Sequence, residues 1–354
     1  MKFRTSFYMI LLLLISMSCR EDGLDIETNV FTLNSLGLVN TTVNQLVLKD
    51  NRLYAMTTKG IYVKNINEQG NFRLLGFEGE NIEDAVIFSE NDILVSFRDI
   101  VFFSEKEPAL YRTLNGGESW AKLETNFGGG EFPEAIHDFE VHPTNPNLIY
   151  ATGNQVIAKS SDFGVTWEPV WGDWQIFANR MRVFVNPFAP NEIWAGGQGA
   201  IENGFLVYIK GEEEQNQWNG LVPNPTVVKK VVFDNQSPQG IYVGWEGELA
   251  KTTDKGATWQ TLFDRHEEAH FFMGIGISQN DPNLVFTGKW IKIEDPQPLE
   301  LYYSQDKGST WKTKNFPGVE FGGVYDLIVK SESGRERIFV GLDKGGVYEI
   351  IMSR

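Results

Sequence analysis

Short apolar runs alternate with turn residues along most of the chain, and one short phrase recurs seven times. Each copy is preceded by another apolar stretch, such as Phe139–Val141 or Val183–Val185, with a Pro, Asn, Asp or Gly turn between the two. Pairs of short apolar runs joined by turns predict antiparallel strands. The sequence therefore predicts seven β-hairpins. The seven copies are Leu53–Ala55, Ile93–Val95, Leu148–Ala151, Glu192–Ala195, Gly240–Val243, Leu284–Phe286 and Arg337–Val340.

A second motif, [S/T]-x-D-x-G-x-T-W, follows several of these hairpins. Intact copies occupy 160–167, 252–259 and 304–311, and 113–120 is a weaker copy with Asn115 in place of Asp. The motif resembles the Asp-box, or BNR, repeat of sialidases, sortilin-type receptors, xyloglucan-cleaving propellers and photosystem II assembly factors. A structural role is expected for its Asp and Trp residues, because an Asp side chain can accept backbone N–H groups across a tight turn while Gly adopts a positive φ. These residues are Asp162, Trp167, Asp254, Trp259, Asp306 and Trp311.

The two repeats together predict an all-β, seven-bladed β-propeller over residues 29–354. About 48 residues are available for each blade, a usual length for four strands. The last blade lacks room for a fourth strand after 345–350, and Val30–Leu38 is expected to supply it. Pairing the first and last segments in one blade removes an exposed sheet edge.

The first residues read as a bacterial export signal. Lys2 and Arg4 precede an apolar run from Phe7 to Ile15, which is too short to span a bilayer. Ser16-Met17-Ser18-Cys19 resembles the cleavage box of bacterial lipoproteins. We therefore expect a signal peptide over 1–18, lipid on Cys19, a polar tether over 19–28, and attachment to the outer membrane or cell surface of a Gram-negative bacterium.

Charge and cysteine content narrow the possible functions. The formal net charge is −16, and it becomes −18 without Lys2 and Arg4, so nucleic acid is an unsuitable partner. Cys19 is the only cysteine, which leaves none for a disulfide, a metal or a nucleophile. A monomer without cofactor or metal is expected.

A candidate site lies where the first strand of each blade begins. Aligning these strands places Gln45, Asp84, Asp138, Arg182, Lys230, Gly274 and Asp326 at equivalent positions, preceded by Asn44, Glu83, His137, Met181, Lys229, Met273 and Tyr325. Six of the seven aligned residues are polar or charged, which favours a binding funnel with an acidic and a basic side, although propeller channels also tolerate polar residues. Exposed aromatic residues are expected at the same face, because their flat apolar surfaces can stack on a sugar or anchor a protein. The predicted ligand-binding residues are Asp84, His137, Asp138, Arg182, Lys230, Tyr325, Asp326, Trp171, Trp174, Trp245 and Trp290.

The leading hypothesis is a non-catalytic envelope lipoprotein that binds a glycan or a protein at this face, and no catalytic residue is assigned. The alternative is a glycoside hydrolase, sialidase-like or xyloglucanase-like, with Asp84, Asp138 and Asp326 as candidate carboxylates. A sialidase requires a Phe-Arg-Ile-Pro phrase, which Phe72-Arg73-Leu74-Leu75 does not match. His266–His270 matches the zinc motif H-E-x-x-H, with Glu294 as a conceivable third ligand, but too few residues are present there for the helix that this motif requires.

Overall fold

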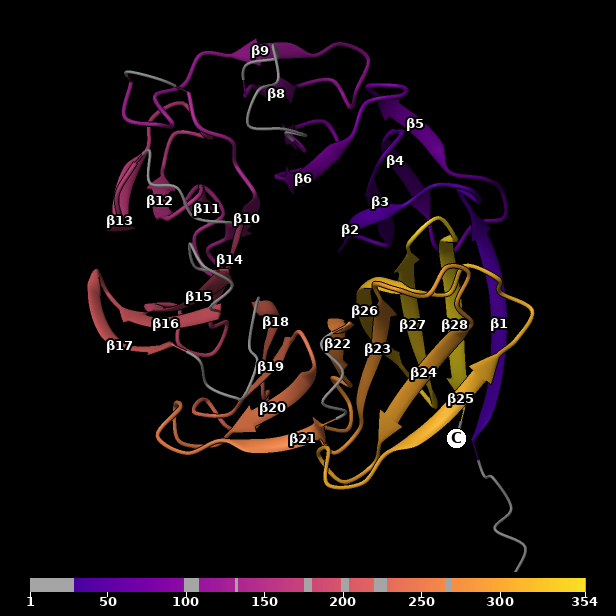
Figure 1. The fold of residues 1–354 in the computed structure, drawn as a ribbon. Coiled ribbons are helices and arrows are strands. Elements are labelled where there is room, and N and C mark those ends of the chain that lie inside the picture. The colour runs from indigo at the N-terminus through magenta and orange to yellow at the C-terminus, as the bar shows by residue number, and fades with distance from the viewer. Residues whose placement is uncertain are drawn as a thin grey trace, which may run out of the picture.

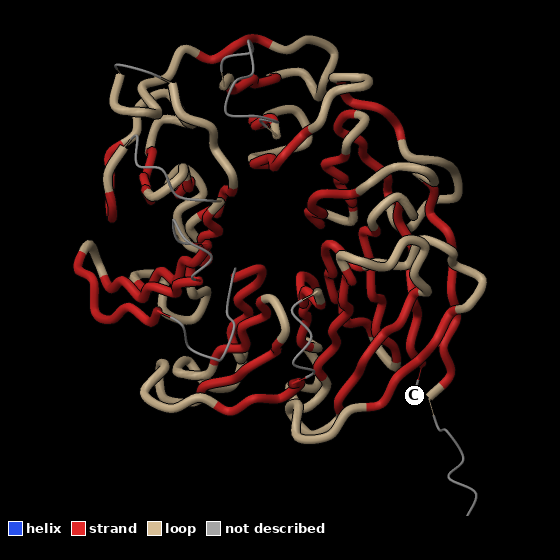
Figure 2. Tube along the Cα trace, in the orientation of Figure 1, coloured by secondary structure: helices blue, strands red, loops and turns tan. Residues whose placement is uncertain are grey.

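The computed structural model describes residues 29–98, 108–130, 133–174, 180–198, 204–219, 228–264 and 269–353. They form seven four-stranded antiparallel sheets, arranged as blades around a central axis (Figure 1). Within these residues the regular structure is entirely β-strand (Figure 2), and no helix could cross a membrane. The predicted signal peptide, lipid attachment at Cys19 and tether lie outside the described residues.

The strands of each blade are named A to D from the central axis outward. Blade 1 contains β2 (Val43–Lys49), β3 (Arg52–Thr57), β4 (Gly60–Asn65) and β5 (Arg73–Gly76). Blade 2 contains β6 (Ile82–Ile87), β7 (Ile93–Phe97), β8 (Leu110–Thr113) and β9 (Ala121–Leu123). Blade 3 contains β10 (Asp138–Val141), β11 (Ile149–Thr152), β12 (Val156–Ser160) and β13 (Glu168–Gly172).

The remaining blades continue in chain order. Blade 4 contains β14 (Met181–Val185), β15 (Glu192–Gln198), β16 (Gly204–Lys210) and β17 (Glu213–Asn219). Blade 5 contains β18 (Val228–Phe233), β19 (Ile241–Trp245), β20 (Glu248–Thr252) and β21 (Gln260–Asp264). Blade 6 contains β22 (His270–Ile277), β23 (Val285–Ile291), β24 (Leu299–Ser304) and β25 (Lys312–Phe316). Blade 7 contains β26 (Val324–Glu332), β27 (Arg335–Leu342), β28 (Gly346–Ser353) and β1 (Val30–Gly37).

The predicted hairpins and the predicted closure are confirmed. Each of the seven recurring phrases lies in or runs into strand B of its blade. Strand β1 pairs antiparallel with β28, in a register that places Val30 opposite Ser353 and Leu33 opposite Ile350. The N-terminal strand thus completes the last blade and covers the edge of β28.

The core lies between neighbouring blades, where their apolar faces pack together. Between blades 4 and 5, Trp194 stacks on Tyr208 at 4.6 Å between ring centroids, and Val231, Val243 and Trp245 belong to the same buried cluster. The other interfaces are also filled by Val, Ile, Leu and aromatic side chains. Burial of these apolar faces is the main stabilising term for such a ring.

The D-x-G segments at 160–167, 252–259 and 304–311 form the turns between strands C and D. In the first, Asp162 Oδ1 accepts the backbone N–H of Thr166 at 2.8 Å and Oδ2 accepts the Thr166 hydroxyl at 2.6 Å. Asp254 and Asp306 accept the corresponding groups of their own turns. The glycines of the three turns adopt φ between 83° and 90°. In the fourth segment Asn115 Oδ1 accepts the N–H of Ser119 at 2.9 Å, so an amide can replace the carboxylate in this turn.

Asp162→Ala is expected to lower the free energy of unfolding by about 1 kcal/mol, because the N–H and hydroxyl of Thr166 lose their acceptor. Asp162→Asn should lower the free energy of unfolding by less, because Asn115 makes the corresponding hydrogen bond in the fourth segment. Partial burial raises the pKa of Asp162, but the Thr166 hydrogen bonds outweigh it and the pKa is lowered. The carboxylate therefore stabilises the fold above about pH 4, and its contribution is lost as the pH falls further. Urea unfolding at pH 7 and pH 3 should show the Ala variant approaching wild type at the lower pH. An equal deficit at both values would contradict this role.

Candidate functional site at the mouth of the propeller

The A strands begin, and the antiparallel B strands end, at one end of the ring, which we call the mouth. The D-x-G turns lie at the opposite end, because they join strands C and D. Strands β2, β6, β10, β14, β18, β22 and β26 surround the central axis (Figure 1). The aligned residues of the sequence analysis therefore lie near the start of these innermost strands.

The three aligned carboxylates connect neighbouring blades. Asp84 Oδ2 accepts the N–H of Phe139 at 2.7 Å, and Asp138 Oδ2 accepts the N–H of Val183 at 2.8 Å. In the same way, Asp326 Oδ2 accepts the N–H of Leu46 at 2.9 Å. Each bond runs to the next blade, to the residue that follows its aligned position. The three buried carboxylates thus join blades 2 to 3, 3 to 4 and 7 to 1.

The two aligned cations are also paired within the ring. Arg182 Nη1 contacts Asp138 Oδ1 at 3.1 Å and donates to Gln45 Oε1 at 2.8 Å, while Lys230 Nζ contacts Asp326 Oδ1 at 2.9 Å. The two adjacent cations of blades 4 and 5 are therefore each paired with a carboxylate of another blade, which the sequence did not predict. Both cations are about a quarter exposed, with side-chain exposures of 28% for Arg182 and 24% for Lys230.

Burial raises the pKa of three carboxyl groups on the innermost strands β6 and β10. Burial and the neighbouring Asp138 raise the pKa of Asp84 well above its usual value, despite two backbone hydrogen bonds. Burial also raises the pKa of Asp138 to about 6, against the opposing effect of Arg182. Glu140, further along β10, has its pKa raised to about 8 by burial and by Asp138. These carboxyl groups hold protons more tightly than exposed ones.

A β-bulge redirects the residue before the aligned position in several blades. In β2 the residues Val43 and Gln45 pair with consecutive residues of β3, which leaves Asn44 as the extra residue. Glu83, Lys229 and Tyr325 are extra residues in the same way, and one extra residue lies between Phe271 and Gly274. A bulge locally re-aims side chains and is common beside functional sites. We call Asn44, Glu83, Lys229 and Tyr325 the bulge ring.

Two arginines that the sequence reasoning did not single out meet the bulge ring. Arg180 Nη1 contacts the buried carboxylate of Glu83 at 3.0 Å, and Arg98 Nε lies 3.4 Å from the same carboxylate. Arg98 also donates from Nη1 to Asn44 Oδ1 at 2.8 Å. Their position in the sequence was the one signal that could have placed them at the mouth. Arg98 directly follows strand B of blade 2, and Arg180 directly precedes strand A of blade 4.

Aromatic side chains gather at the mouth between blades 6 and 7. The ring of Trp290 lies 5.3 Å from Phe271 and 5.3 Å from Tyr325, in tilted and edge-to-face arrangements. Trp290 Nε1 donates to Asp343 Oδ2 at 3.0 Å, which fixes the indole. Trp290 and Tyr325 are half-buried, and burial raises the pKa of Tyr325 to about 12. These two predicted residues are therefore brought together with partly open faces.

The other predicted aromatics do not join this cluster. Trp245 is 1% exposed and belongs to the core between blades 4 and 5, so the expectation that it is an exposed ligand-binding residue was wrong. Trp171 lies in the outer strand β13 and not in a loop; it stacks on Phe205 at 5.9 Å and donates to Glu214. Trp174 packs against Phe127 at 4.8 Å.

His137 is buried directly before the aligned residue of blade 3. Its Nε2 lies 2.9 Å from Asn154 Oδ1, on the turn that follows strand B of the same blade. This contact places the imidazole at the mouth but in a hydrogen bond within its own blade.

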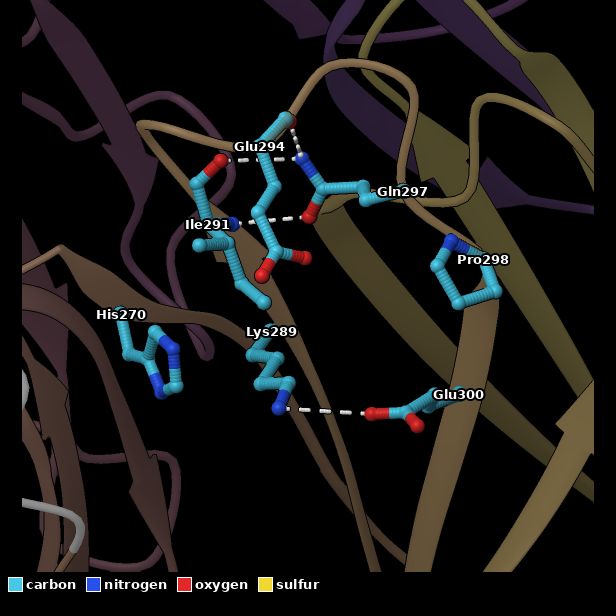
Figure 3. Close-up of a pocket in the computed structure, with 7 residues that line it drawn as sticks. All are labelled: His270, Lys289, Ile291, Glu294, Gln297, Pro298 and Glu300. Carbon is cyan, nitrogen blue, oxygen red and sulfur yellow. Dashed lines mark hydrogen bonds and ion pairs between the residues drawn. The ribbon is translucent and has the colours of Figure 1, made fainter.

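A cavity of about 240 Å³ lies in blade 6 at the same end of the molecule (Figure 3). The side-chain amide of Gln297 holds the loop above the cavity. Its Oε1 accepts the backbone N–H of Ile291, and its Nε2 donates to the Ile291 carbonyl. Lys289 pairs with Glu300 at 3.3 Å across the cavity. The other residues that line it are His270, Ile291, Glu294 and Pro298.

This cavity is lined by one histidine of the zinc motif and by its conceivable third ligand. His270 and Glu294 both line it, whereas His266 lies outside the described residues. His270 belongs to strand β22, which lacks the helical spacing that the motif requires. Among the described residues no group of three His, Cys, Asp or Glu side chains is suited to hold a metal ion.

A larger cavity of about 430 Å³ lies at the end opposite the mouth, between blades 3 and 4. Its lining residues come from the A–B and C–D turns and the strands beside them, and include His142, Lys159, Thr166 and Glu212. This cavity is the main competing location for a ligand.

No family model matches the chain. Two curated fungal proteins are similar in sequence. A probable oligoxyloglucan-reducing end-specific xyloglucanase of Neosartorya fischeri is 27% identical over 324 residues, which are 83% of this chain and 35% of that protein. The oligoxyloglucan-reducing end-specific xyloglucanase of Emericella nidulans is 24% identical over 287 residues, covering 74% of this chain and 33% of that protein. This chain thus spans about a third of the length of these relatives.

Solved structures support the fold. The GH74 xyloglucanase of Xanthomonas campestris superposes with a TM-score of 0.68 at 12% identity, over 90% of this chain and 53% of that one. YCF48 of Cyanidioschyzon merolae superposes with a TM-score of 0.59 at 14% identity, over 91% of this chain and 98% of that one. The two structures share the propeller architecture with this chain, although they differ in name and in the share of their length that is matched.

Proposed function

We propose that this chain is a carbohydrate-active propeller that binds a β-1,4-glucan of the xyloglucan type at its mouth. The observation that carries the proposal is the sequence similarity of most of the chain to two xyloglucanases. The mouth is preferred to the opposite end because it combines half-buried aromatic faces with charged and amide side chains, the combination that sugar rings and their hydroxyls require.

Trp290 and Tyr325 are the proposed stacking residues. The indole of Trp290 is held by Asp343 and is braced by Phe271, so little conformational entropy is lost when a sugar packs against it. The blade 6 cavity adds polar groups from Lys289, Glu294 and Glu300 within the same blade. Its volume is of the order of a single sugar residue, smaller than a usual small-molecule pocket.

Hydrolysis is the second candidate function, because both relatives are named as xyloglucanases. The raised pKa values of Asp84 and Asp138 are of the kind that a general acid needs. Against this, each of these carboxylates is buried and accepts a backbone N–H of the neighbouring blade. The geometry of these two carboxylates therefore fits a structural role better than a catalytic one.

Trp290→Ala is expected to weaken binding of a xyloglucan oligosaccharide about tenfold, as loss of a stacking aromatic does at other interfaces. Isothermal titration calorimetry measures this effect, with Trp171→Ala as the control because Trp171 lies on the outer strand of blade 3. Thermal unfolding checks that both variants remain folded. Equal affinities for the two variants would place the ligand away from blades 6 and 7.

The same samples, incubated and analysed for released oligosaccharides, distinguish binding from hydrolysis. Binding without products leaves the chain as a recognition module. Product formation that is abolished by Asp84→Asn or Asp138→Asn in folded protein would establish the hydrolase alternative.

A further inference from the structure

The carboxylate of Asp343 lies at the edge of the Trp290 indole and has unused hydrogen-bonding capacity. Its Oδ2 accepts the Nε1–H of Trp290 at 3.0 Å, and its Oδ1 accepts the hydroxyl of Thr42 at 2.8 Å. A carboxylate can accept about four hydrogen bonds, so roughly half of this capacity stays open. Asp343 is only half-buried, which leaves it within reach of a ligand at the mouth.

Asp343 also differs from the paired carboxylates of the mouth. Asp138 and Asp326 each form an ion pair with an Arg or Lys side chain. Over the part of the chain that the structure describes, no such cation lies within ion-pair distance of the Asp343 carboxylate, since the side chain of the neighbouring Lys344 contacts Asp295. The negative charge of Asp343 is therefore available to a hydrogen-bond donor from a ligand.

The hydroxyl of Tyr325 is a second polar group beside the same indole. The rings of Tyr325 and Trp290 meet edge-to-face, with 5.3 Å between their centroids, and among the described residues the Tyr325 hydroxyl has no hydrogen-bond partner. Burial and the negative charge of Asp343 raise the pKa of Tyr325 to about 12, although Arg98 acts in the opposite direction. The hydroxyl therefore keeps its proton at neutral pH and can both donate and accept.

The backbone holds these groups in place before a ligand binds. The N–H of Asp343 donates to the carbonyl of Gly323 at 2.8 Å, two residues before Tyr325. Gly323 also leaves room for the indole, because a Cβ atom at this position would lie 2.5 Å from Cδ1 of Trp290. A carboxylate and an aromatic surface that are fixed in this way lose little conformational entropy on binding.

We propose that Asp343 and the Tyr325 hydroxyl determine the specificity of the mouth for sugars, by bonding two hydroxyl groups of the sugar residue that stacks on Trp290. The inference rests on the proposed function and deepens it. One sugar hydroxyl donates to the Asp343 carboxylate, and another forms a hydrogen bond with the Tyr325 hydroxyl. A pyranose with equatorial hydroxyls fits, because it offers a flat apolar face with polar groups around its rim. A site of this kind disfavours a ligand without hydroxyls, since its polar groups then stay unpaired.

Tyr325→Phe tests the proposal most cleanly, because it removes one hydroxyl and keeps both the aromatic ring and the bond between Asp343 and Trp290. Calorimetry with a xyloglucan oligosaccharide at pH 7 should show about fivefold weaker binding, the effect of one neutral hydrogen bond. Asp343→Asn should weaken binding at least about tenfold, because the sugar hydroxyl loses a charged acceptor. Its amide oxygen can still accept the indole N–H.

Tyr150→Phe and Asp50→Asn are the matched controls, because they make the same chemical changes at the opposite end of the molecule. Tyr150 lines the cavity there, and Asp50 lies on the exposed turn between β2 and β3. Both controls should bind as tightly as wild type, and thermal unfolding checks that all variants are folded. Unchanged affinity in folded Tyr325→Phe or Asp343→Asn, with weaker binding in Trp290→Ala, would overturn the hydroxyl recognition and leave the proposed function standing. If wild type does not bind the oligosaccharide, both proposals fail.

Discussion

Trp245→Ala is expected to lower the free energy of unfolding by about 3–5 kcal/mol, a large loss for a single substitution. Trp245 is 1% exposed and packs with Val228, Val231 and Val243 in the interface of blades 4 and 5. Its removal leaves a cavity that strands of two sheets cannot readily fill. Urea unfolding followed by circular dichroism measures the loss.

Trp171→Ala provides the comparison for this prediction. Trp171 is only partly buried on the outer strand β13, so its removal should cost clearly less than that of Trp245. Near-wild-type stability of Trp245→Ala would mean that the two blades do not pack as described. Trp245 would then again be a candidate for ligand binding at the surface.

Asp326→Ala is expected to lower the free energy of unfolding by about 3 kcal/mol, the lower end of the range for breaking a buried ion pair. Asp326 accepts the N–H groups of Leu46 and Leu327, both at 2.9 Å, and pairs with Lys230. The bond to Leu46 joins blade 7 to blade 1, where the ring closes. Partial exposure of Lys230 lets water relieve some of the lost pairing, which is why the lower end of the range applies.

A double-mutant cycle separates the two contributions of Asp326. In Asp326→Ala/Lys230→Met the unpaired cation is gone, so part of the stability should return, while the loss from the Leu46 and Leu327 N–H groups should remain. Strict additivity of the two single substitutions would contradict the pairing of Asp326 with Lys230.

The sequence predicted the architecture well because its signals were local. Apolar phrases such as Leu53–Ala55, the turn residues between them and the D-x-G segments each depend on a few neighbouring residues. The sevenfold recurrence of the apolar phrases left little choice of fold. The alignment of the A strands also predicted correctly that Asp84, Asp138 and Asp326 would be equivalent.

The partners of those residues were not predictable from the same signals. The bond from Asp138 to Val183 N–H depends on how one blade meets the next, which a single-strand pattern does not contain. The bulges are a second cause, because one extra residue reverses which side of a strand each following side chain faces. Lys229 therefore points differently from what simple alternation indicates.

Trp171 and Trp245 were misplaced for related reasons. Strand β13 runs from Glu168 through Pro169 to Gly172, so Trp171 lies on the outer strand of blade 3 and not at the mouth cluster. Trp245 ends β19 opposite Val228, just before the bulge, and its side chain faces the blade interface. Arg98 and Arg180 lie in connections, where hydrophobic periodicity gives no direction for a side chain.

Hydrogen–deuterium exchange with and without a xyloglucan oligosaccharide tests the central claim, glycan binding at the mouth, most directly. The backbone amides of two peptides at the mouth, 289–298 and 322–326, should exchange more slowly at saturating ligand. The amides of the turns at 160–167 and 252–259, at the opposite end, should exchange at an unchanged rate. Protection confined to those turns, or to the cavity lined by His142, Lys159 and Glu212, would contradict the account.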